Sequence, residues 1–251
     1  MSLIPALSLA KQLETLGLST FAITYLDLAK RMEKEQKSCV DFLKELTENE
    51  ITHRHQKRVE RLLKAAKLPR NKLLIDFDVA RISGLSRAKV QTLAQGDFMD
   101  GYENLLIFGN PGTGKTHLSI ALAREWCLQN RKVLYTSAAC LVQHLLKAKA
   151  DLKLEQFIKK MDTFEILVID DISYIPFDRQ ETDVLFTLLS ARYETRSVAI
   201  TSNLPFAKWD QIFKDTMTTA ACVDRLVHHA TVLELNAESY RIASAKKRSQ
   251  K

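Results

Sequence analysis

The chain has 251 residues, of which 46% are hydrophobic and 27% are charged, proportions typical of an ordinary globular protein. They exclude a fibrous or intrinsically disordered chain, and the length allows one main core with a smaller appended domain. The apolar residues at the start carry no basic flank and are interrupted by Lys11 and Glu14. We therefore expect no export or membrane-spanning segment, no membrane partner, and a cytoplasmic location.

The first predicted domain is small, all-helical and covers residues 1–70. Residues 3–68 contain one proline, Pro5, and one glycine, Gly17, and their apolar residues recur at helical intervals. Pro69 ends the last of these helices. The following residues, 72–100, mix polar and apolar side chains, and we expect them to form a connector.

Positive charge is concentrated at the end of this helical domain. The formal net charge is +7, and between His53 and Lys72 eight basic residues stand against one acidic residue, Glu60. We call residues 53–72 the basic segment. Because the rest of the chain is close to neutral, this segment indicates an acidic partner.

The pattern then changes to short β-rich runs that alternate with helical segments. Such alternation predicts an α/β domain with a central parallel sheet flanked by helices, which we assign to residues 71–245, followed by a basic tail over 246–251. The predicted strands are Leu105–Phe108, Val133–Thr136, Ile166–Ile169 and Val198–Thr201.

A glycine-rich loop follows the first predicted strand directly. All seven glycines of the chain lie at or before position 114, and the spacing G-x-x-x-x-G-K-T lets successive backbone N–H groups point at phosphate oxygens. The loop consists of Gly109, Asn110, Pro111, Gly112, Thr113, Gly114, Lys115 and Thr116. We predict that it binds ATP, with Lys115 neutralising the outer phosphates, Thr116 a ligand of Mg²⁺, and the helix from His117 aimed at the same anion.

Two later strand ends supply further candidates. Asp170 and Asp171 follow an apolar strand, where ligands of parallel sheets bind; Asp170 is the expected magnesium ligand and Asp171 the expected base that activates water. Asn203 follows the strand ending at Thr201, where an uncharged amide could hold the attacking water. An asparagine before a proline turn also occurs for backbone reasons alone.

The order of these motifs, completed by Asp224-Arg225-Leu226, resembles the AAA+ ATPases. Within that class the amino-acid sequence resembles IstB, the transposition helper ATPase of insertion sequences, over nearly the whole chain. The strings that carry this resemblance lie at residues 109–118, 201–206, 224–230 and 238–241. Helicase loaders of the DnaC type share the ATPase core, but the last two strings favour IstB.

The resemblance implies a regulator that assembles on duplex DNA in its ATP state, with little sequence preference, and that recruits or stimulates the transposase. It makes Arg225 an arginine finger that reaches the nucleotide of a neighbouring subunit in a ring or spiral oligomer. Arg241 is a candidate second nucleotide sensor. Because Asp171 stands where Glu is usual in AAA+ proteins, slow ATP turnover is expected. Without the resemblance, Arg225 would be interpreted as a surface ion-pair residue.

Two basic regions are candidates for DNA contact, and lysines in such regions contact phosphates without reading bases. One is the basic segment. The other is a helical stretch over residues 141–161, with Lys147, Lys149, Lys153, Lys159 and Lys160. A solvated helix face with no DNA contact is the alternative for the helical stretch, whereas the basic segment could instead face a transposase or the next subunit. Neither region is preferred on the sequence.

The cysteines and histidines show no spacing typical of a metal site. We expect the four cysteines to be reduced thiols in the core. We expect the six histidines, including His228 and His229, to serve packing at the core or surface. Rival functions for the whole chain are a replicative helicase loader, a small-molecule P-loop kinase and a DNA-binding module with an inactive nucleotide pocket.

Overall fold

A computed structural model describes residues 8–172, 177–213 and 216–240 of the chain. The chain divides into two compact units, Met1–Arg61 and Leu62–Lys251. The predicted basic tail over 246–251 and Arg241 lie outside the described residues. Among the described residues, no helix is long and apolar enough to cross a membrane.

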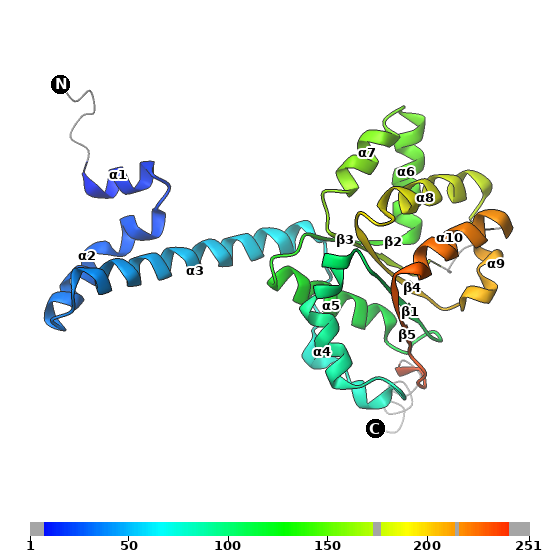
Figure 1. Cartoon of the computed structure of the whole chain (residues 1–251), viewed down its shortest axis with the longest axis horizontal. Coiled ribbons are helices and arrows are strands. Elements are labelled where there is room, and N and C mark those ends of the chain that lie inside the picture. Colours follow the sequence, from blue (N-terminus) through cyan, green and yellow to red (C-terminus); the bar gives the residue numbers. More distant parts are fainter. Residues whose placement is uncertain (1–7, 173–176, 214–215, 241–251) are drawn as a thin grey trace, which may run out of the picture. The chain divides into compact units, whose positions relative to one another are not determined.

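The first unit is all-helical, which confirms this part of the predicted fold. It contains α1 (Leu9–Thr15), α2 (Ser19–Lys34) and most of α3 (Cys39–Ala65) (Figure 1). Leu28 and Met32 of α2 pack with Leu46 of α3 in a small core. The buried Glu50 carboxylate accepts hydrogen bonds from the backbone N–H of Thr20 (2.9 Å) and from Nε of Arg54 (2.7 Å), which ties the start of α2 to α3.

The second unit is built on a parallel sheet of five strands in the order β2-β3-β4-β1-β5. The strands are β1 (Asn104–Phe108), β2 (Val133–Ser137), β3 (Ile166–Asp170), β4 (Ser197–Ser202) and β5 (Ala230–Glu234). Every strand pair is parallel, so the carboxyl ends of β1, β3 and β4 lie together at one edge. The sheet confirms the predicted α/β class.

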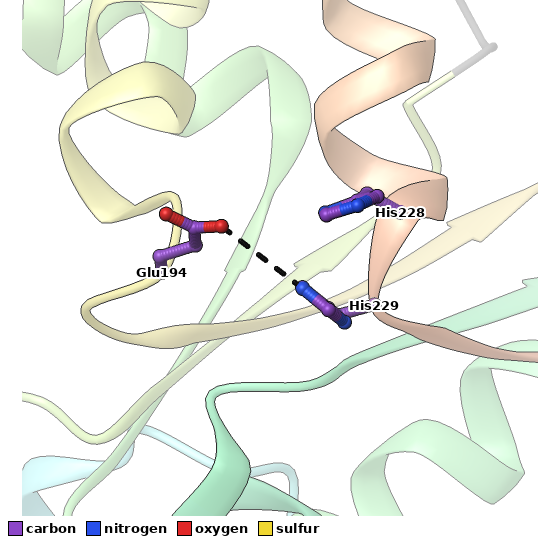
Figure 2. Close-up of side chains that lie close together, drawn as sticks. All are labelled: Glu194, His228 and His229. Atoms are coloured by element: carbon purple, nitrogen blue, oxygen red, sulfur yellow. Dashed lines mark ion pairs between the residues drawn. The ribbon is translucent and has the colours of Figure 1, made fainter.

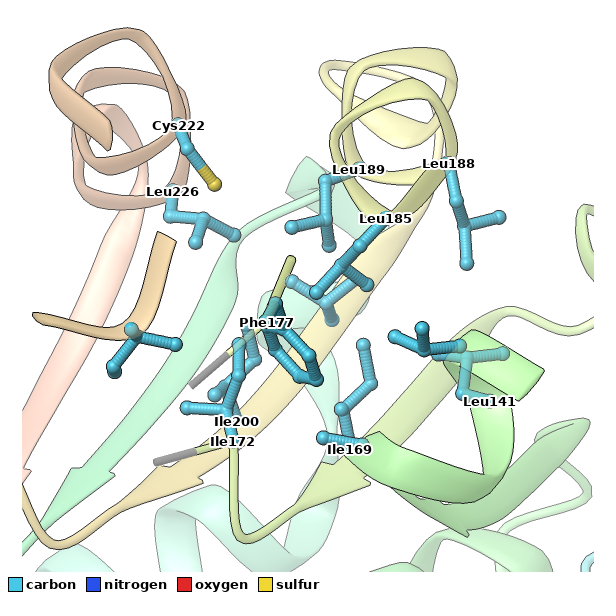
Figure 3. Close-up of a cluster of buried hydrophobic side chains, with 14 of the residues drawn as sticks. Leu141, Ile169, Ile172, Phe177, Leu185, Leu188, Leu189, Ile200, Cys222 and Leu226 are labelled. Carbon is cyan, nitrogen blue, oxygen red and sulfur yellow. The ribbon is translucent and has the colours of Figure 1, made fainter. Parts of the chain in front are cut away.

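Helices cover both faces of this sheet because successive strand residues point to opposite sides. Leu105 and Ile107 of β1 pack toward α5 (Lys115–Leu128) and α4 (Arg87–Gln95), whereas Leu106 and Phe108 face the other side. That second face is covered by α6 (Ala138–Ala150), α8 (Arg179–Arg192) and α10 (Thr216–His228), whose apolar side chains meet Ile169 and Ile200 (Figure 3). The remaining helices are α7 (Leu154–Met161) and the short α9 (Asp210–Phe213).

Local sequence signals explain where several of these helices begin. The Ser86 hydroxyl accepts a hydrogen bond from the first turn of α4, and Ser137 does the same for α6. Asp178 and Glu181 form a reciprocal capping box at the start of α8. These side chains satisfy backbone N–H groups that have no partner within the helix.

Several expectations need correction. Residues 72–100 form more than a connector, since they contain α4 and 3₁₀ turns at Leu74–Asp76, Val79–Arg81 and Asp97–Gly101. The helical stretch over 141–161 is divided into α6 and α7 by a turn in which Leu152 is left-handed (φ 55°). Cys127 and Cys222 are buried as expected, but Cys39 and Cys140 are exposed; all four are free thiols.

Candidate nucleotide-binding site

The glycine-rich loop connects β1 to α5, and all three of its glycines lie at close approaches. A Cβ at Gly109 would lie 2.7 Å from the carbonyl oxygen of Leu235. Gly112 has a left-handed backbone (φ 83°), and a Cβ at this position would lie 2.2 Å from Oγ of Ser239. Gly114 is also left-handed (φ 104°), and its Cβ would lie 3.0 Å from the ring of Phe77. Any side chain at Gly112 would therefore collide with the segment after β5 as well as strain the loop.

Lys115 is the first residue of α5, two residues earlier than the predicted helix start at His117. Its side chain is buried, and its Nζ donates hydrogen bonds to the carbonyl oxygens of Gly109 (2.7 Å) and Asn110 (3.1 Å). The Thr113 hydroxyl also donates to Asn110 O (2.9 Å). The loop thus curves around the ammonium group at the positive end of a helix, an arrangement that suits a bound phosphate.

Thr116 and Asp170 meet at the edge of the sheet. The Thr116 hydroxyl donates to Oδ1 of Asp170 (3.1 Å), although the two residues come from α5 and the end of β3. A hydroxyl and a carboxylate are the hard oxygen ligands that Mg²⁺ prefers. The two residues therefore fit a magnesium ion bound beside the loop.

Two further hydroxyl groups hold the same carboxylate. Thr201 of β4 donates to Oδ1 of Asp170 (2.6 Å), and Tyr135 of β2 donates to Oδ2 (2.8 Å). Burial raises the pKa of Tyr135 above its usual range, and the charges of Asp170 and Asp171 add to that shift, so this phenol remains a proton donor at physiological pH. Neither residue was predicted to hold Asp170: no motif marks Tyr135, and Thr201 stood out in the sequence only as the end of a strand and the start of the 201–206 string.

Asp171 and Asn203 lie at the same edge. The Asp171 backbone is left-handed (φ 61°), and its N–H donates to the Thr201 hydroxyl (2.8 Å). Asn203 directly follows β4, whose last carbonyl, that of Ser202, accepts a hydrogen bond from the N–H of Gly109 (3.3 Å). The sheet therefore brings the expected base and the expected water-holding amide to the carboxyl edge that carries the loop.

A cavity of about 440 Å³ opens beside the loop, a volume in the range of small-molecule sites. Loop residues from Gly112 to His117 form part of its wall. The other lining residues, which were not predicted to belong to the nucleotide site, come from two segments: Lys72, Asp76, Phe77, Asp78, Arg81 and Ile82 on one, and Ala237, Glu238 and Tyr240 on the other. The half-buried His117 ring contacts Phe77 and lies 2.9 Å from the carbonyl of Leu73, which attaches the first segment to α5.

Arg225 lies on α10 and contacts α8 within the same chain. Its Nη1 donates to the Ser190 hydroxyl (3.0 Å), and its guanidinium stands 4.9 Å from the centre of the Phe186 ring. The residue is half-buried and lines a shallow pocket with Tyr193, Glu194 and His229. These contacts hold the side chain on the surface of one subunit; whether it reaches a neighbour's nucleotide stays a prediction.

The five candidate DNA-binding lysines are all exposed, on α6, on α7 and in the turn between them. Lys159 forms an ion pair with Glu155 (2.6 Å), so part of its charge is compensated. In the basic segment, Arg54 is engaged by Glu50 (2.7 Å), whereas Lys72 lines the cavity beside the loop. Both regions therefore keep exposed basic residues for an added anion: Lys147, Lys149, Lys153 and Lys160 in the helical stretch, and residues such as Lys57 and Arg58 in the basic segment.

A five-stranded parallel sheet that carries a phosphate-binding loop after β1 and an aspartate at the end of β3 defines a P-loop AAA+ domain. Solved structures have the same fold. DnaA from Aquifex aeolicus bound to AMPPCP superimposes with a TM-score of 0.57 and 20% identity, over 73% of this chain and 56% of that one, so this chain spans little more than half of DnaA. The DnaC helicase loader gives a TM-score of 0.53 and 18% identity over 66% of this chain and 98% of that one.

Within the AAA+ fold, the chain belongs to one particular family. Residues 11–249 match the family of IstB-like ATP binding proteins, and the chain belongs to this family. A protein of Sinorhizobium fredii whose name describes an insertion-sequence ATP-binding protein is 42% identical over 93% of this chain and 78% of its own length. The corresponding protein of insertion sequence IS21 from Pseudomonas aeruginosa is 37% identical over 88% of this chain and 83% of its own.

Proposed function

We propose that this protein hydrolyses ATP with Mg²⁺ and uses the ATP-bound state to assemble on DNA during transposition of an insertion sequence. The observation that carries the ATPase proposal is the hydrogen bond of 3.1 Å between Thr116 and Asp170, beside a loop closed around Lys115. It joins the phosphate loop to a carboxylate on another strand. Membership of a family of ATP binding proteins supports the same proposal.

Each residue of the proposed site has its own part in ATP hydrolysis. Lys115 and the backbone N–H groups of the loop bind the outer phosphates, and Thr116 with Asp170 would hold Mg²⁺, which when bound withdraws charge from the phosphate oxygens. Asp171 accepts a proton from the attacking water, and Asn203 orients that water. Because the Asp171 carboxylate is one methylene shorter than the usual Glu, we expect slow turnover.

The variant Lys115→Ala tests the site. It removes the cation of the loop and should abolish ATP binding, measured with a fluorescent ATP analogue, because phosphate charge is then left uncompensated. The matched control is Lys132→Ala, which removes an exposed lysine before β2 and should bind as the parent does. Parental ATP affinity in Lys115→Ala would refute the assignment of the loop.

Asp171→Asn separates binding from hydrolysis. It should bind ATP normally but hydrolyse it at least about a hundredfold more slowly, since an amide cannot take the proton from water. The measurement is phosphate release at saturating ATP. An unchanged turnover rate would mean that Asp171 is not the base.

The proposal includes self-association, with Arg225 acting on the nucleotide of a neighbouring subunit. Three observations support this role of Arg225: the residue lies on α10, it lines a pocket open to solvent, and the chain belongs to a family of ATP binding proteins. The test is a mixture of two inactive variants. Lys115→Ala keeps the arginine and Arg225→Ala keeps the nucleotide site, so co-assembled mixtures should recover part of the ATPase activity. If the mixtures co-assemble but stay inactive, Arg225 has only a structural role, through its contact with Ser190 of α8.

Duplex DNA is the proposed acidic partner, and the exposed lysines of α6 and α7 are its proposed contact. Replacing Lys147, Lys149 and Lys153 by Gln should weaken binding to all sequences alike and reduce the slope of log K against log salt by about 2 to 3. A matched triple change at Lys30, Lys34 and Lys44 in the first unit provides the control. An unchanged slope in the first variant would direct attention to the basic segment.

The proposed protein partner is a transposase, because the relatives are named for insertion sequences. Exposed apolar side chains on the first unit, such as Ile23 (78% exposed) and Val40 (74%), offer a surface for protein contact. A helicase loader is the second candidate, since the DnaC loader shares the fold. A pull-down with a transposase of an IS21-type insertion sequence, compared with a pull-down with a replicative helicase, distinguishes the two. Both functions would operate in the bacterial cytoplasm, where the DNA lies.

A further inference from the structure

Glu194, His228 and His229 form an exposed cluster away from the nucleotide site. Their side-chain ligand atoms all lie within 4.8 Å of one another. Glu194 comes from the turn between α8 and β4, His228 is the last residue of α10, and His229 follows it (Figure 2). Sequence spacing did not indicate this cluster, because the fold brings Glu194 to the two histidines from an earlier part of the chain.

The backbone that carries these side chains is held by one buried residue, Asn104. Its N–H donates to the carbonyl of His229 (2.7 Å), and its Nδ2 donates to that of Leu226 (3.1 Å). Its Oδ1 accepts from the N–H of Val198 (3.0 Å) at the start of β4. Asn104 thus joins the end of α10 to the strand that follows Glu194, and the three side chains are brought together before any ligand binds.

The turn of Glu194 is itself well defined. The N–H groups of Thr195 and Arg196 both donate to the carbonyl of Arg192 (3.0 and 2.9 Å). Glu194 has a left-handed backbone (φ 57°), a conformation in which glycine or asparagine would be less strained. Its carboxylate Oε1 faces Nε2 of His229 at 4.0 Å (Figure 2).

His228 has the partner that a metal-binding histidine needs. Its Nδ1 lies 2.9 Å from the Tyr193 hydroxyl oxygen. With the proton on Nδ1, the ring would donate to that oxygen, and the lone pair on Nε2 would be free for a metal ion. A second hydrogen bond of this kind fixes the tautomer and the orientation of histidines that bind metals.

We propose that Glu194, His228 and His229 bind a divalent transition-metal ion of the Zn²⁺ type. Two imidazoles and one carboxylate suit Zn²⁺, whereas Mg²⁺ and Ca²⁺ prefer oxygen ligands alone. Tetrahedral Zn²⁺ needs ligand atoms about 3.3 Å apart, so the exposed side chains must move inward by about an ångström. Water would complete the coordination.

The position of the ion would affect α10. It would connect the end of this helix to the turn after α8, and Arg225, one turn earlier on α10, contacts α8 through Ser190 (3.0 Å). Metal binding would therefore restrain the helix that carries Arg225. The metal site itself does not depend on the proposed ATPase function.

One competing site must be removed before the test. Sγ of Cys140 lies 3.6 Å from Nδ1 of His144 on α6, and a thiol–imidazole pair also attracts Zn²⁺. Full-length Cys140→Ser protein, reduced and free of nucleotide, is therefore titrated with Zn²⁺ by calorimetry and with Co²⁺ by visible absorption. We expect one equivalent to bind, with Co²⁺ bands of a four- or five-coordinate site that lacks thiolate.

Substitutions at the cluster show whether the bound metal ion occupies this site. Glu194→Gln and His229→Ala should each abolish binding, and Tyr193→Phe, which removes the partner of His228, should weaken it about tenfold. His144→Ala should leave it unchanged. Circular dichroism checks that each variant is folded, and all these side chains are exposed enough for substitution. The proposal would be overturned if the Cys140→Ser protein bound no equivalent of metal ion, or if one equivalent still bound in both the Glu194→Gln and the His229→Ala variants.

Discussion

Thr201→Val tests how the structure supports the Asp170 carboxylate. Thr201 is 1% exposed, and valine has nearly its shape, so the change creates no cavity. It removes two hydrogen bonds of the hydroxyl: the one donated to Oδ1 of Asp170 (2.6 Å) and the one accepted from the N–H of Asp171 (2.8 Å). Both losses occur beside the proposed magnesium ligands.

The magnitude follows from these two contacts. A hydrogen bond to an ionised group contributes about 1.5 to 3 kcal/mol, and a buried N–H left without a partner costs about 1 to 3 kcal/mol. Because the Asp171 N–H is only partly buried, we take the lower part of both ranges and expect a loss of about 3 kcal/mol in the free energy of unfolding. The measurement is urea unfolding followed by circular dichroism.

A second readout concerns Mg²⁺. Loss of the Thr201 hydroxyl lets the carboxylate rotate, and an orientation cost of about 1.4 kcal/mol would raise the Mg²⁺ concentration for half-maximal ATPase activity about tenfold. The control is Thr187→Val, whose exposed hydroxyl donates to Asp183 O (2.7 Å) within α8 and should matter by less than about 0.5 kcal/mol. A loss below 1 kcal/mol in Thr201→Val, with an unchanged Mg²⁺ requirement, would refute this account.

Further predictions concern the loop and the core. Gly112→Ala should weaken binding of a fluorescent ATP analogue, because the new Cβ would displace the Ser239 hydroxyl and lie 3.0 Å from Ser239 Cβ. Gly84→Ala, with a similar φ of 81° and no atom within 4 Å, should cost only backbone strain and bind normally. Equal affinity in the two variants would contradict the steric argument. Burial raises the pKa of Cys127 and of Cys222 from 9.0 to about 12, so above pH 9 the unfolded chain loses thiol protons that the folded chain retains. Stability should therefore fall between pH 9 and 12, and urea unfolding of Cys222→Ala should show a smaller fall than the parent; an identical slope would exclude this thiol as a cause.

Some features of this protein were determined by local sequence. The phosphate loop is one, because eight consecutive residues from Gly109 to Thr116 carry both the backbone freedom and the cation that phosphate binding needs. The α/β class is another, because strands and helices impose different periods on apolar residues, and both were visible along the chain. The predicted strand Ile166–Ile169 is one residue shorter at its end than β3, which extends to Asp170. Helix bounds were less exact: the helix after the loop begins at Lys115, two residues before the predicted start at His117, and the predicted helical stretch over 141–161 is divided into α6 and α7.

The tertiary structure alone decided which distant residues share a site. Tyr135 and Thr201 meet on Asp170 because β2, β3 and β4 are neighbours in the sheet, and Phe77 and Tyr240 line one cavity although they flank the domain in sequence. Glu194 meets His229 in the same way. Each of these contacts depends on a separation of a few ångströms between segments that only strand order and helix packing bring together. Periodicity and spacing describe neighbours along the chain, and they contain no information on such distances.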